Sequence, residues 1–560
     1  MHDFRQAPAL LDLLRQARPI WALGAEQPLV QWRHVELTLA AAPRNPALAA
    51  PAAGLLCWMW QQRPLVKVFA ETLPALAPYL DKPSPKLLAM ARVMGRSVNP
   101  DPDPVPESPN EPDAVLADCL ALVKRPGHGL YHLGEGLDML LTLGGLDQAR
   151  ELLAAAKTLD LPATILDRLT AEWALAALLE DDPHQALEIV AKVDPEIFAW
   201  WRENGLARAE DTAGDTDAAT KRLLDLWTRM PWHVNLGLAL HDRLNPLDAD
   251  PAILDRHDVR VLLYSWNKAQ VLGETLASLA KTDLGPAKVM VLDNGSSDDT
   301  GAMLSRVRAE WDAARPGSLE TVTLPVNVGA PAARNWLLSL EEARNAEMVA
   351  FLDDDLLLPR DWLVKLLAAA EAHPYAGAIG CMVTDHIPPH AIQAADFHML
   401  HPETPAAFFN DVKERVHIFQ NATSSRDRDL FAYTRPCLSV TGCCHLLRTE
   451  AIQAAGPFDV SFNPSQFDDL ERDLRSATKG HPCAYTGALQ VRHLQHSSLR
   501  QADSPAKSAH IHGNKIKLEA KFQDKDLMAL YQWDQDTAWS DWKRKTEALV
   551  RAAAATDPAS

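Results

Sequence analysis

The second half of the chain alternates short apolar runs with amphipathic helical segments, and this alternation restricts the fold more than any other feature of the sequence. The apolar runs lie at 259–264, 289–292, 319–324 and 348–352. Short buried strands separated by helices predict a parallel, doubly wound sheet. Because the ligands of such sheets bind beyond the carboxyl ends of the strands, the polar residues that end each run are the first candidates for a functional site.

A chain of 560 residues is too long for one hydrophobic core, so we expect several domains. The N-terminal half lacks the strand pattern and is predicted to be α-helical and repeat-like, followed by an α/β domain. Two proline-bearing stretches, 98–113 and 244–258, suggest the boundaries. We predict an N-terminal helical module (1–97), a proline-rich linker (98–113), a second helical region (114–245), the α/β domain (255–525) and a helical C-terminal tail (526–560).

Three segments of the second helical region share one pattern, a short acidic or glycine turn followed by an amphipathic helix. Ala149, Ala186 and Ala219 hold corresponding positions, at steps of 37 and 33 residues, where a small side chain lets two helices approach closely. This period resembles a tetratricopeptide array. Such an array offers a concave surface to a peptide or protein, or serves only as a spacer or dimer contact, and the sequence leaves both interpretations open.

The composition is that of a soluble globular protein, with 47% apolar and 23% charged residues. A net charge of −19 repels polyphosphate backbones, so we expect no nucleic-acid partner. The N-terminus lacks the apolar core of a signal peptide, and the most apolar stretch, 46–60, is too short to span a bilayer. We therefore expect a buried helix at 46–60, no transmembrane segment and a cytoplasmic protein. Seven cysteines, an odd number, fit small buried hydrophobic residues.

The strongest chemical signal is a row of three carboxylates, Asp353, Asp354 and Asp355, directly after the apolar run 348–352. Packing like charges together is costly unless a cation neutralises them. Asp353 and Asp355 form a D-x-D pair, whose hard oxygen ligands suit Mg²⁺ or Mn²⁺ together with waters and substrate phosphates. Taken alone, the triplet is equally compatible with a solvated acidic turn before the helix that starts near Pro359.

Seven sequence blocks, taken in their order along the chain, support a functional site in the second half of the chain. They are VLLYSWNKAQVLGETLASL (261–279), VMVLDNGSSDDT (289–300), NVGAPAARNWLL (327–338), FLDDDLLLPRDWL (351–363), VTGCCHLLRTEAIQAAGPFD (440–459), DDLERDLRSATKG (468–480) and VRHLQHSS (491–498). Each block is weak, but together they resemble family 2 glycosyltransferases. The resemblance implies a GT-A fold with a Rossmann-like, mainly parallel sheet, a divalent metal and an inverting reaction. It does not extend to residues 1–250.

The resemblance also implies roles for individual residues. The donor-binding residues would be Tyr264, Trp266, Asn267, Asp293, Asn294, Arg334, Asp353 and Asp354. The metal ligands would be Asp353, Asp355 and His493, with His496 a second candidate histidine. Arg334 could contact the diphosphate or pair with the acidic block.

A second acidic block, 468–471, carries the implied catalytic base. The resemblance places Asp469 where it takes the proton of the acceptor hydroxyl, with Asp468 a close second. The alternative is that these acids are only N-terminal charges that favour the dipole of a helix over 468–479.

The chain departs from the family pattern at a few positions. Trp266 stands where Tyr or Phe is usual, and Asn294 replaces a second Asp, a variant common among bacterial members. Glu471 and Arg472 stand where Asp and Leu are usual. The Asn294 variant leaves the choice of nucleotide open.

We therefore expect an inverting, metal-dependent glycosyltransferase that moves a sugar from a nucleoside-diphosphate sugar to a hydroxyl acceptor. A protein acceptor bound by the helical repeats and a surface polysaccharide or lipid-linked glycan are equally compatible. One alternative, a GT-A-like nucleotidyltransferase, would need a Gly-rich loop where this chain has Tyr264-Ser-Trp-Asn-Lys268. The other, an inactive scaffold acting through helical repeats, is disfavoured because both acidic blocks are present. We also expect residues 250–560 to bind the donor without the helical half.

Overall fold

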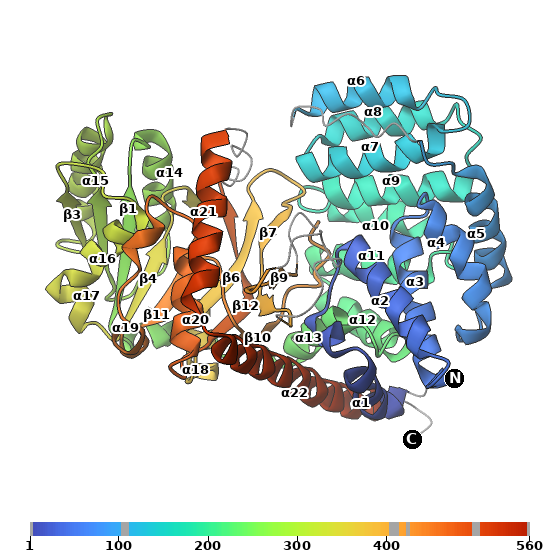
Figure 1. Ribbon diagram of the computed structural model, residues 1–560. Helices are drawn as coiled ribbons and strands as arrows, with labels where there is room; N and C mark the ends of the chain where they lie inside the picture. The colour runs from blue at the N-terminus through green and yellow to red at the C-terminus, as the bar shows by residue number, and fades with distance from the viewer. Residues whose placement is uncertain (1–3, 102–110, 402–413, 422–425, 495–504, 557–560) are drawn as a thin grey trace.

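The computed structural model describes residues 4–101, 111–401, 414–421, 426–494 and 505–556, which form two lobes (Figure 1). A helical lobe ends at Leu244, and a sheet covered by helices makes up the second lobe. The long C-terminal helix α22 (Asp524–Thr556) runs beneath both lobes (Figure 1). Among the described residues, none of the helices combines the length and the apolar character that a membrane span requires.

Each helix of the helical lobe from α6 to α13 packs against the next along the chain. Ala149, Ala186 and Ala219 are fully buried, as predicted for positions of close helix approach. The helices of this lobe are α1 (Ala7–Ala17), α2 (Pro28–Ala41), α3 (Ala49–Gln62), α4 (Lys67–Thr72), α5 (Pro85–Ser97), α6 (Pro112–Leu122), α7 (Gly129–Leu143), α8 (Leu146–Ala156), α9 (Ala163–Ala177), α10 (Pro183–Ala191), α11 (Ala199–Thr212), α12 (Thr216–Arg229) and α13 (Val234–Leu244). Of the predicted proline-rich linker, residues 102–110 lie outside the described part of the chain.

The apolar stretch 46–60 forms helix α3, which is buried along almost its whole length, as the sequence predicts. The end of this helix is closed by Arg168 from α9, whose guanidinium donates to the carbonyls of Gln61 and Gln62, both at 2.9 Å. Arg168 also pairs with Glu172 one turn further on, at 2.7 Å. A buried guanidinium thus satisfies carbonyls that a helix end leaves without partners, and it holds α3 in the centre of the lobe.

The four predicted apolar runs form parallel strands in one sheet. The strand order is β10-β12-β6-β11-β4-β1-β2-β3, with β11 and β10 antiparallel to their neighbours. The strands of this sheet are β1 (Val259–Ser265), β2 (Lys288–Asp293), β3 (Leu319–Thr323), β4 (Met348–Leu352), β5 (Leu356–Leu357), β6 (Ala378–Asp385), β7 (Ile392–Ala394), β10 (Thr434–Cys437), β11 (Cys444–Arg448) and β12 (Cys483–His493). The predicted fold class, a helical N-terminal half followed by a mainly parallel α/β sheet, is confirmed.

Helices connect these strands and cover the sheet (Figure 1). They are α14 (Ala269–Leu279), α15 (Thr300–Ala314), α16 (Ala330–Ser339), α17 (Glu341–Asn345), α18 (Trp362–Ala372), α19 (Thr449–Ala455), α20 (Asp468–Ala477) and α21 (Pro505–Lys521). A small second sheet pairs β8 (Phe397–Met399) with β9 (Ile418–Gln420). The carboxyl ends of β1, β2, β4, β6 and β12 meet at one edge of the main sheet, which places the polar residues that follow them together.

A buried network of charges joins the two lobes to α22. Arg435 on β10 pairs with Asp396 and donates to the carbonyls of Ala22 and Leu23 in the N-terminal segment, both at 2.9 Å. His398 lies between Asp396 and Asp534 of α22, at 2.8 Å from each carboxylate. Although burial disfavours the imidazolium, Asp534 and Asp396 raise the pKa of His398. Every one of these charged groups therefore has a partner from another part of the chain.

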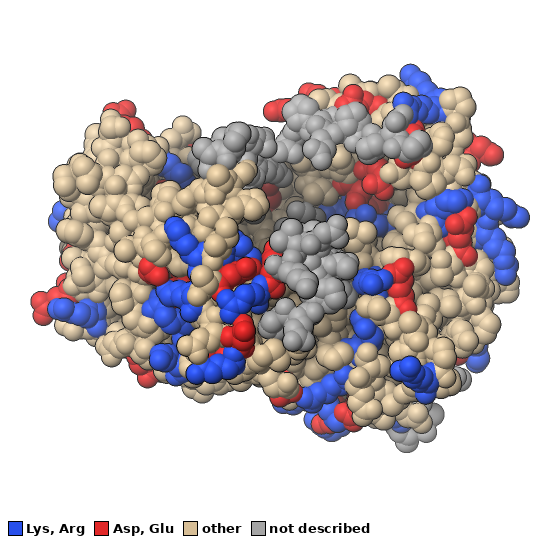
Figure 2. Space-filling view, in the orientation of Figure 1, with Lys and Arg blue, Asp and Glu red and all other residues tan. Residues whose placement is uncertain are grey.

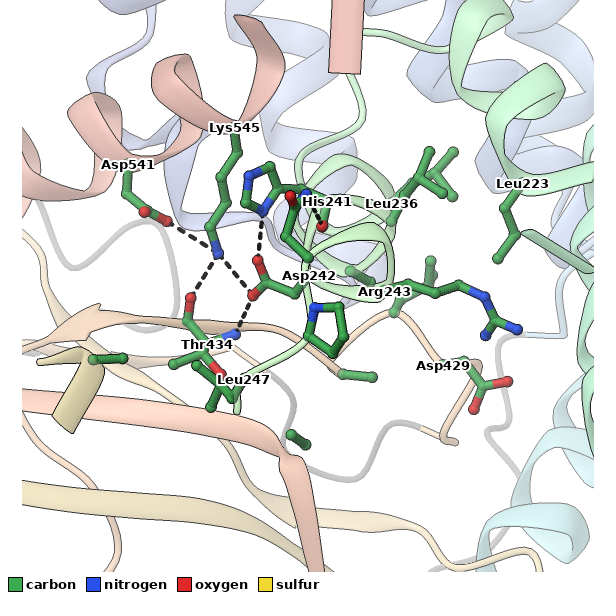
Figure 3. Close-up of a pocket in the computed structure, with 18 of the residues that line it drawn as sticks. Leu223, Leu236, His241, Asp242, Arg243, Leu247, Asp429, Thr434, Asp541 and Lys545 are labelled. Atoms are coloured by element: carbon green, nitrogen blue, oxygen red, sulfur yellow. Dashed lines mark hydrogen bonds and ion pairs between the residues drawn. The ribbon is translucent and has the colours of Figure 1, made fainter. Parts of the chain in front are cut away.

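A cavity of about 960 Å³ adjoins this network, between α13, α18, β10 and α22 (Figure 3). Lys545 of α22 and Asp242 of α13 meet in its wall at 2.8 Å, and Lys545 also donates to the carbonyl of Thr434 at 2.6 Å. Asp242 in turn accepts from His241 at 2.7 Å and from the Thr434 N–H at 2.6 Å. These polar groups are satisfied by one another and do not point free hydrogen-bonding atoms at a ligand. We therefore interpret the cavity as space left where the two lobes pack together.

These contacts change what we expect of residues 250–560 expressed alone. Helix α22 packs against α1 and α13 of the helical lobe, and its Trp539 and Trp542 are buried. Without the helical lobe, both indoles would face water and Arg435 would lose two carbonyl acceptors. We therefore expect the isolated fragment to be poorly soluble, so donor binding is better measured on the full chain.

The buried charge network that joins the two lobes predicts a large loss of stability for Arg435→Met. The change removes the guanidinium from the buried Asp396 carboxylate, which keeps only His398 as an ion-pair partner among the described residues, and it removes a donor from the carbonyls of Ala22 and Leu23. It should cost about 3–5 kcal/mol of unfolding free energy. The measurement is the urea midpoint of the full chain. The matched control is Arg15→Met: the side chains of Arg15 and Asp536 are 47% and 48% exposed, so the loss should stay below about 1 kcal/mol. Lys and Arg are interspersed with Asp and Glu on the face shown in Figure 2. Equal losses in the two variants would show that Arg435 does not hold the lobes together.

Candidate active site

The three consecutive aspartates lie at the carboxyl edge of the sheet, directly after β4. Their backbone is fixed from both sides. The Asp353 N–H donates to the carbonyl of Cys443 at 2.8 Å, and the Leu494 N–H donates to the carbonyl of Asp355 at 2.7 Å. The triplet is therefore held between the start of β11 and the end of β12, which are elements far away in sequence.

Asp354, the middle carboxylate, has both oxygens bonded within the protein. Ser265 at the end of β1 donates to Oδ2 at 2.5 Å, and Lys268 donates to Oδ1 at 2.8 Å. The Lys268 ammonium also reaches Asp355, at 3.2 Å. A fixed cation thus offsets part of the like-charge repulsion in the triplet. These contacts join the segment after β4 to the end of β1, and the contact of Asp354 with the donor stays a prediction.

Asp353 and Asp355 face a histidine. His493, the last residue of β12, places Nε2 2.7 Å from Asp355 Oδ1, while Nδ1 lies 2.8 Å from the Gln393 side-chain oxygen. Burial, with the charge of Asp355 beside it, raises the pKa of Asp353. For Asp355 burial acts in the same direction, but the hydrogen bond and charge of His493 outweigh it and lower the pKa.

Ligand atoms of Asp353, His493 and Cys443 lie within 4.8 Å of one another. With Asp355 bonded to His493, four groups that can bind a cation converge at the predicted metal position. Carboxylate and imidazole donors fit a divalent ion, so the residues present agree with the metal that the sequence implies. The second candidate histidine, His496, lies outside the described residues.

The second acidic block begins helix α20 and separates its two aspartates by environment. Asp468 is buried and pairs with Arg334 of α16. Asp469 is partly exposed, and its Oδ2 accepts from the Gly442 N–H at 3.0 Å. A Cβ added to Gly442 would stand 3.0 Å from both Asp469 Oδ2 and the Arg334 guanidinium, so a larger residue here would require these side chains to shift. Arg334 itself lies 4.0 Å from Asp353, so it connects the two acidic blocks.

Glu471, the third acid of this block, is fully buried and does not face the site. It pairs with Arg475 at 2.8 Å and with Lys521 of α21 at 2.7 Å. This arrangement explains the departure at this position, because a longer side chain reaches both cations. Arg334 pairs with the acidic blocks in this structure, and its contact with the diphosphate stays a prediction.

The ends of β1 and β2 are bonded into a shared rim. Asn267, with φ of 53°, receives a hydrogen bond on its side-chain oxygen from the Ser297 N–H at 2.7 Å. Asp293 accepts from the Ser296 N–H at 2.9 Å. Asn294 accepts from the Val328 N–H at 3.0 Å and thereby holds the following loop. These contacts give the rim a defined shape before any ligand arrives.

The rim presents an aromatic surface on one side. Trp266 leaves half of its surface, 50%, exposed, although an indole usually gains from burial. Tyr264 lies deeper, with the Arg334 guanidinium 5.4 Å from its ring centre, and burial raises its pKa. The predicted donor residues thus fall into two groups, rim residues and an inner group around Arg334.

The helical lobe reaches the same edge of the sheet. Glu180, in the turn between α9 and α10, contacts His390 at 3.0 Å and Arg492 at 2.7 Å. Arg492 precedes His493 on β12. Gly144, at the end of α7, packs so closely on Ile387 that an added Cβ would stand 2.5 Å from its side chain. The helical lobe therefore forms a wall beside the metal position.

The described parts of the polar segment 414–429 are fastened to the helical lobe at one end. In the described parts of 414–429, Arg426 contacts Asp138 at 2.9 Å and Glu172 at 3.2 Å, and Arg428 contacts Glu172 at 3.2 Å. These pairs are largely shielded from water. The segment is thus anchored at this end between the two lobes.

Sequence reasoning missed three residues of the site. Lys268 lies in the first block, in the segment that argues against the Gly-rich loop of a nucleotidyltransferase, but the pattern indicated no role for it in the site. Cys443 stood in the fifth block and was interpreted as a small buried hydrophobic residue; all seven cysteines are indeed buried and unpaired. Gln393 gave no signal, because no motif surrounds it and only the tertiary fold brings β7 to the end of β12.

Comparison with known proteins agrees with this geometry. Residues 261–455 match the family model described as Glycosyl transferase family 2. The O-antigen biosynthesis protein RfbC of Myxococcus xanthus is 26% identical over 234 residues, covering 40% of this chain and 16% of that protein. The succinoglycan biosynthesis protein ExoM of Rhizobium meliloti (strain 1021) is 30% identical over 136 residues, covering 23% of this chain and 41% of that protein. The chain thus spans less than half the length of either relative.

Solved structures give low similarity scores. The mannosyltransferase PcManGT from Pyrobaculum calidifontis, in complex with GDP-Man and Mn²⁺, shows 19% identity and a TM-score of 0.34 over 60% of this chain and 88% of that one. GalNAc-T7 with UDP, GalNAc and Mn²⁺ shows 13% identity and a TM-score of 0.36 over 52% and 55%. The family assignment therefore rests on the sequence match and on the sheet: residues 261–455 of this chain form a glycosyltransferase domain of family 2.

Proposed function

We propose that the C-terminal lobe transfers a sugar, with inversion, from a nucleoside diphosphate to a hydroxyl of an acceptor, using a divalent cation held by Asp353, Asp355 and His493. The observation that carries the proposal is the meeting, at one sheet edge, of the metal-binding group with the Asp469 carboxylate, which accepts backbone hydrogen bonds from Gly442 and Leu470 but has no ion pair among the described residues. Arg334 links them, because it lies between Asp353 and Asp468. A bound cation would neutralise the charge that develops on the leaving diphosphate.

The rim supports a position for the nucleoside. The exposed indole of Trp266 offers a flat face for a base, and the turn at 293–297 offers Asp293 and backbone groups for the ribose. Lys268 and Arg334 flank the acidic triplet and lower its net charge where a diphosphate would lie. Without these cations, the carboxylates would repel the donor.

Asp469 is the proposed base. The acceptor oxygen attacks the anomeric carbon from the face opposite the diphosphate, the bond to the diphosphate breaks, and the hydroxyl proton passes to the Asp469 carboxylate. Asp469 has no ion pair among the described residues, whereas Asp468 forms an ion pair with Arg334. The Gly442 N–H orients the carboxylate but leaves it able to accept a proton.

The names of the two relatives, both biosynthesis proteins of bacterial polysaccharides, favour a growing surface glycan as the acceptor. The wall that the helical lobe forms through Glu180 and Gly144 would then bound the acceptor side of the site. A protein acceptor remains the second candidate, since a helical array of this kind can bind a peptide. A panel of sugar nucleotides with glycan and peptide acceptors separates the two, with the glycosylated product identified by mass.

Donor binding should depend on a divalent cation. Calorimetric titration of the full chain with a nucleoside diphosphate should show binding with Mn²⁺ and a loss of at least about tenfold in affinity with EDTA, because the acidic triplet repels the diphosphate without the ion. Undiminished affinity in EDTA would remove the metal from the proposal. Released nucleoside diphosphate indicates glycosyl transfer, whereas pyrophosphate released from a triphosphate would indicate a nucleotidyltransferase.

Asp469→Asn should lower turnover by about 10²–10⁴ while donor affinity and the unfolding midpoint stay near those of the unchanged chain, because the amide keeps the shape but accepts no proton. The readouts are steady-state kinetics, donor titration and urea unfolding. Glu310→Gln, an exposed acid on α15, is the control and should change none of them.

Asp468→Asn should behave differently from Asp469→Asn. It leaves Arg334 without its buried carboxylate, so we expect a loss of about 3 kcal/mol of unfolding free energy along with activity. If Asp468→Asn is dead but fully stable and Asp469→Asn retains turnover, the base is Asp468. If both variants keep near-normal turnover, the block serves only the helix dipole.

A further inference from the structure

We propose that Cys443 supplies a thiolate ligand to the metal site, which makes this a mixed carboxylate–imidazole–thiolate centre that selects a softer transition ion such as Co²⁺ or Zn²⁺ over Mg²⁺. The inference deepens the proposed function, on whose metal position it rests. It starts from one geometric fact: the Cys443 thiol, an Asp353 oxygen and a His493 nitrogen lie within 4.8 Å of one another. Atoms this close can surround one ion with little side-chain movement.

The neighbours of Cys443 single it out from the other cysteines. Its sulfur lies within 4.8 Å of an Asp353 carboxylate oxygen and of a His493 ring nitrogen. Cys444, the next residue, is turned elsewhere, and its carbonyl lies 3.7 Å from the Cys381 sulfur. A side chain present only to fill space has no need of a carboxylate and an imidazole beside it, and a thiol among them resembles a ligand set.

His493 is already oriented for metal binding. Its Nδ1 lies 2.8 Å from the Gln393 side-chain oxygen, which can only accept, so Nδ1 carries a proton. A cation can therefore displace the proton of Nε2, which now bonds Asp355, and take its lone pair. Fixing the far nitrogen of a histidine through a hydrogen bond is a common support for metal ligands.

The chemistry of the donors decides which ions fit. Oxygen ligands alone suit Mg²⁺, Ca²⁺ and Mn²⁺, whereas a thiolate and an imidazole favour softer transition ions. Asp353, Cys443 and His493 would hold a bound ion together, and the Cys443 thiol would release its proton to solvent when the ion binds. The Asp353–Cys443–His493 set should therefore discriminate strongly against Mg²⁺, which binds thiolate poorly.

The test uses Co²⁺ alone as the probe on the full chain, since a thiolate bound to Co²⁺ produces a ligand-to-metal charge-transfer band in the near ultraviolet. We expect this band in the unchanged protein and in Cys444→Ser, and its loss in Cys443→Ser with Co²⁺ affinity reduced at least about tenfold. Cys444→Ser is a matched control because it is also a buried cysteine, one residue along the chain. Excess Mg²⁺ should not displace Co²⁺ from the unchanged protein but should compete in Cys443→Ser.

Two results would overturn the inference. One is a Co²⁺ complex of the unchanged protein that shows ligand-field bands but no charge-transfer band. The other is a charge-transfer band that survives in folded Cys443→Ser. Cys443→Ala is the second variant if the serine chain fails to fold, and circular dichroism checks both. Because no donor or turnover enters the measurement, a negative result leaves glycosyl transfer standing, and an inactive enzyme with an intact band leaves the thiolate ligand standing.

Discussion

The active edge of this protein depends on one electrostatic constraint, the crowding of carboxylates after β4. Three adjacent aspartates at the end of a buried strand would repel one another, and basic side chains from three distant elements lie beside them. Lys268 comes from the end of β1, Arg334 from α16 and His493 from β12. Because each cation is tied to a different strand or helix, the ion pairs also fix how these elements sit at the sheet edge.

The same basic side chains determine which of the acids have a close ionic partner. Asp354 and Asp468 are each bonded to a fixed cation, so they hold β1 to β4 and α16 to α20. Asp353 and Asp469 lack such a close pair among the described residues and stay available for a metal or a proton. Asp355 lies between these groups, since it shares Lys268 and His493. The carboxylates that we propose for catalysis and metal binding thus differ in their partners from the structural ones, although they are neighbours in sequence.

The sequence predicted the fold class, because it depends on the local alternation of apolar runs and helical segments, and motif spacing pointed to two acidic blocks that the fold brings to one edge of the sheet. The alternating runs needed no tertiary knowledge. What escaped prediction depends on long-range contact: Gln393 meets His493 only because β7 folds back along β6. The opposite roles of Asp468 and Asp469 were likewise invisible, since burial and the approach of Arg334 and Gly442 separate two identical side chains.

The helical lobe and the glycosyltransferase domain form one structural unit through α22 and Arg435, although sequence suggested separable parts. The Arg435 guanidinium takes its acceptors from the N-terminal segment and its counter-ion from the domain, while Asp534 of α22 completes the network through His398. Charges buried this deeply are tolerated only when every partner is in place. The lobes therefore cannot separate without exposing them, and the wall that Glu180 forms beside His493 stays in a fixed position relative to the metal ligands. An acceptor bound against that wall would meet the donor in a geometry set by the whole chain.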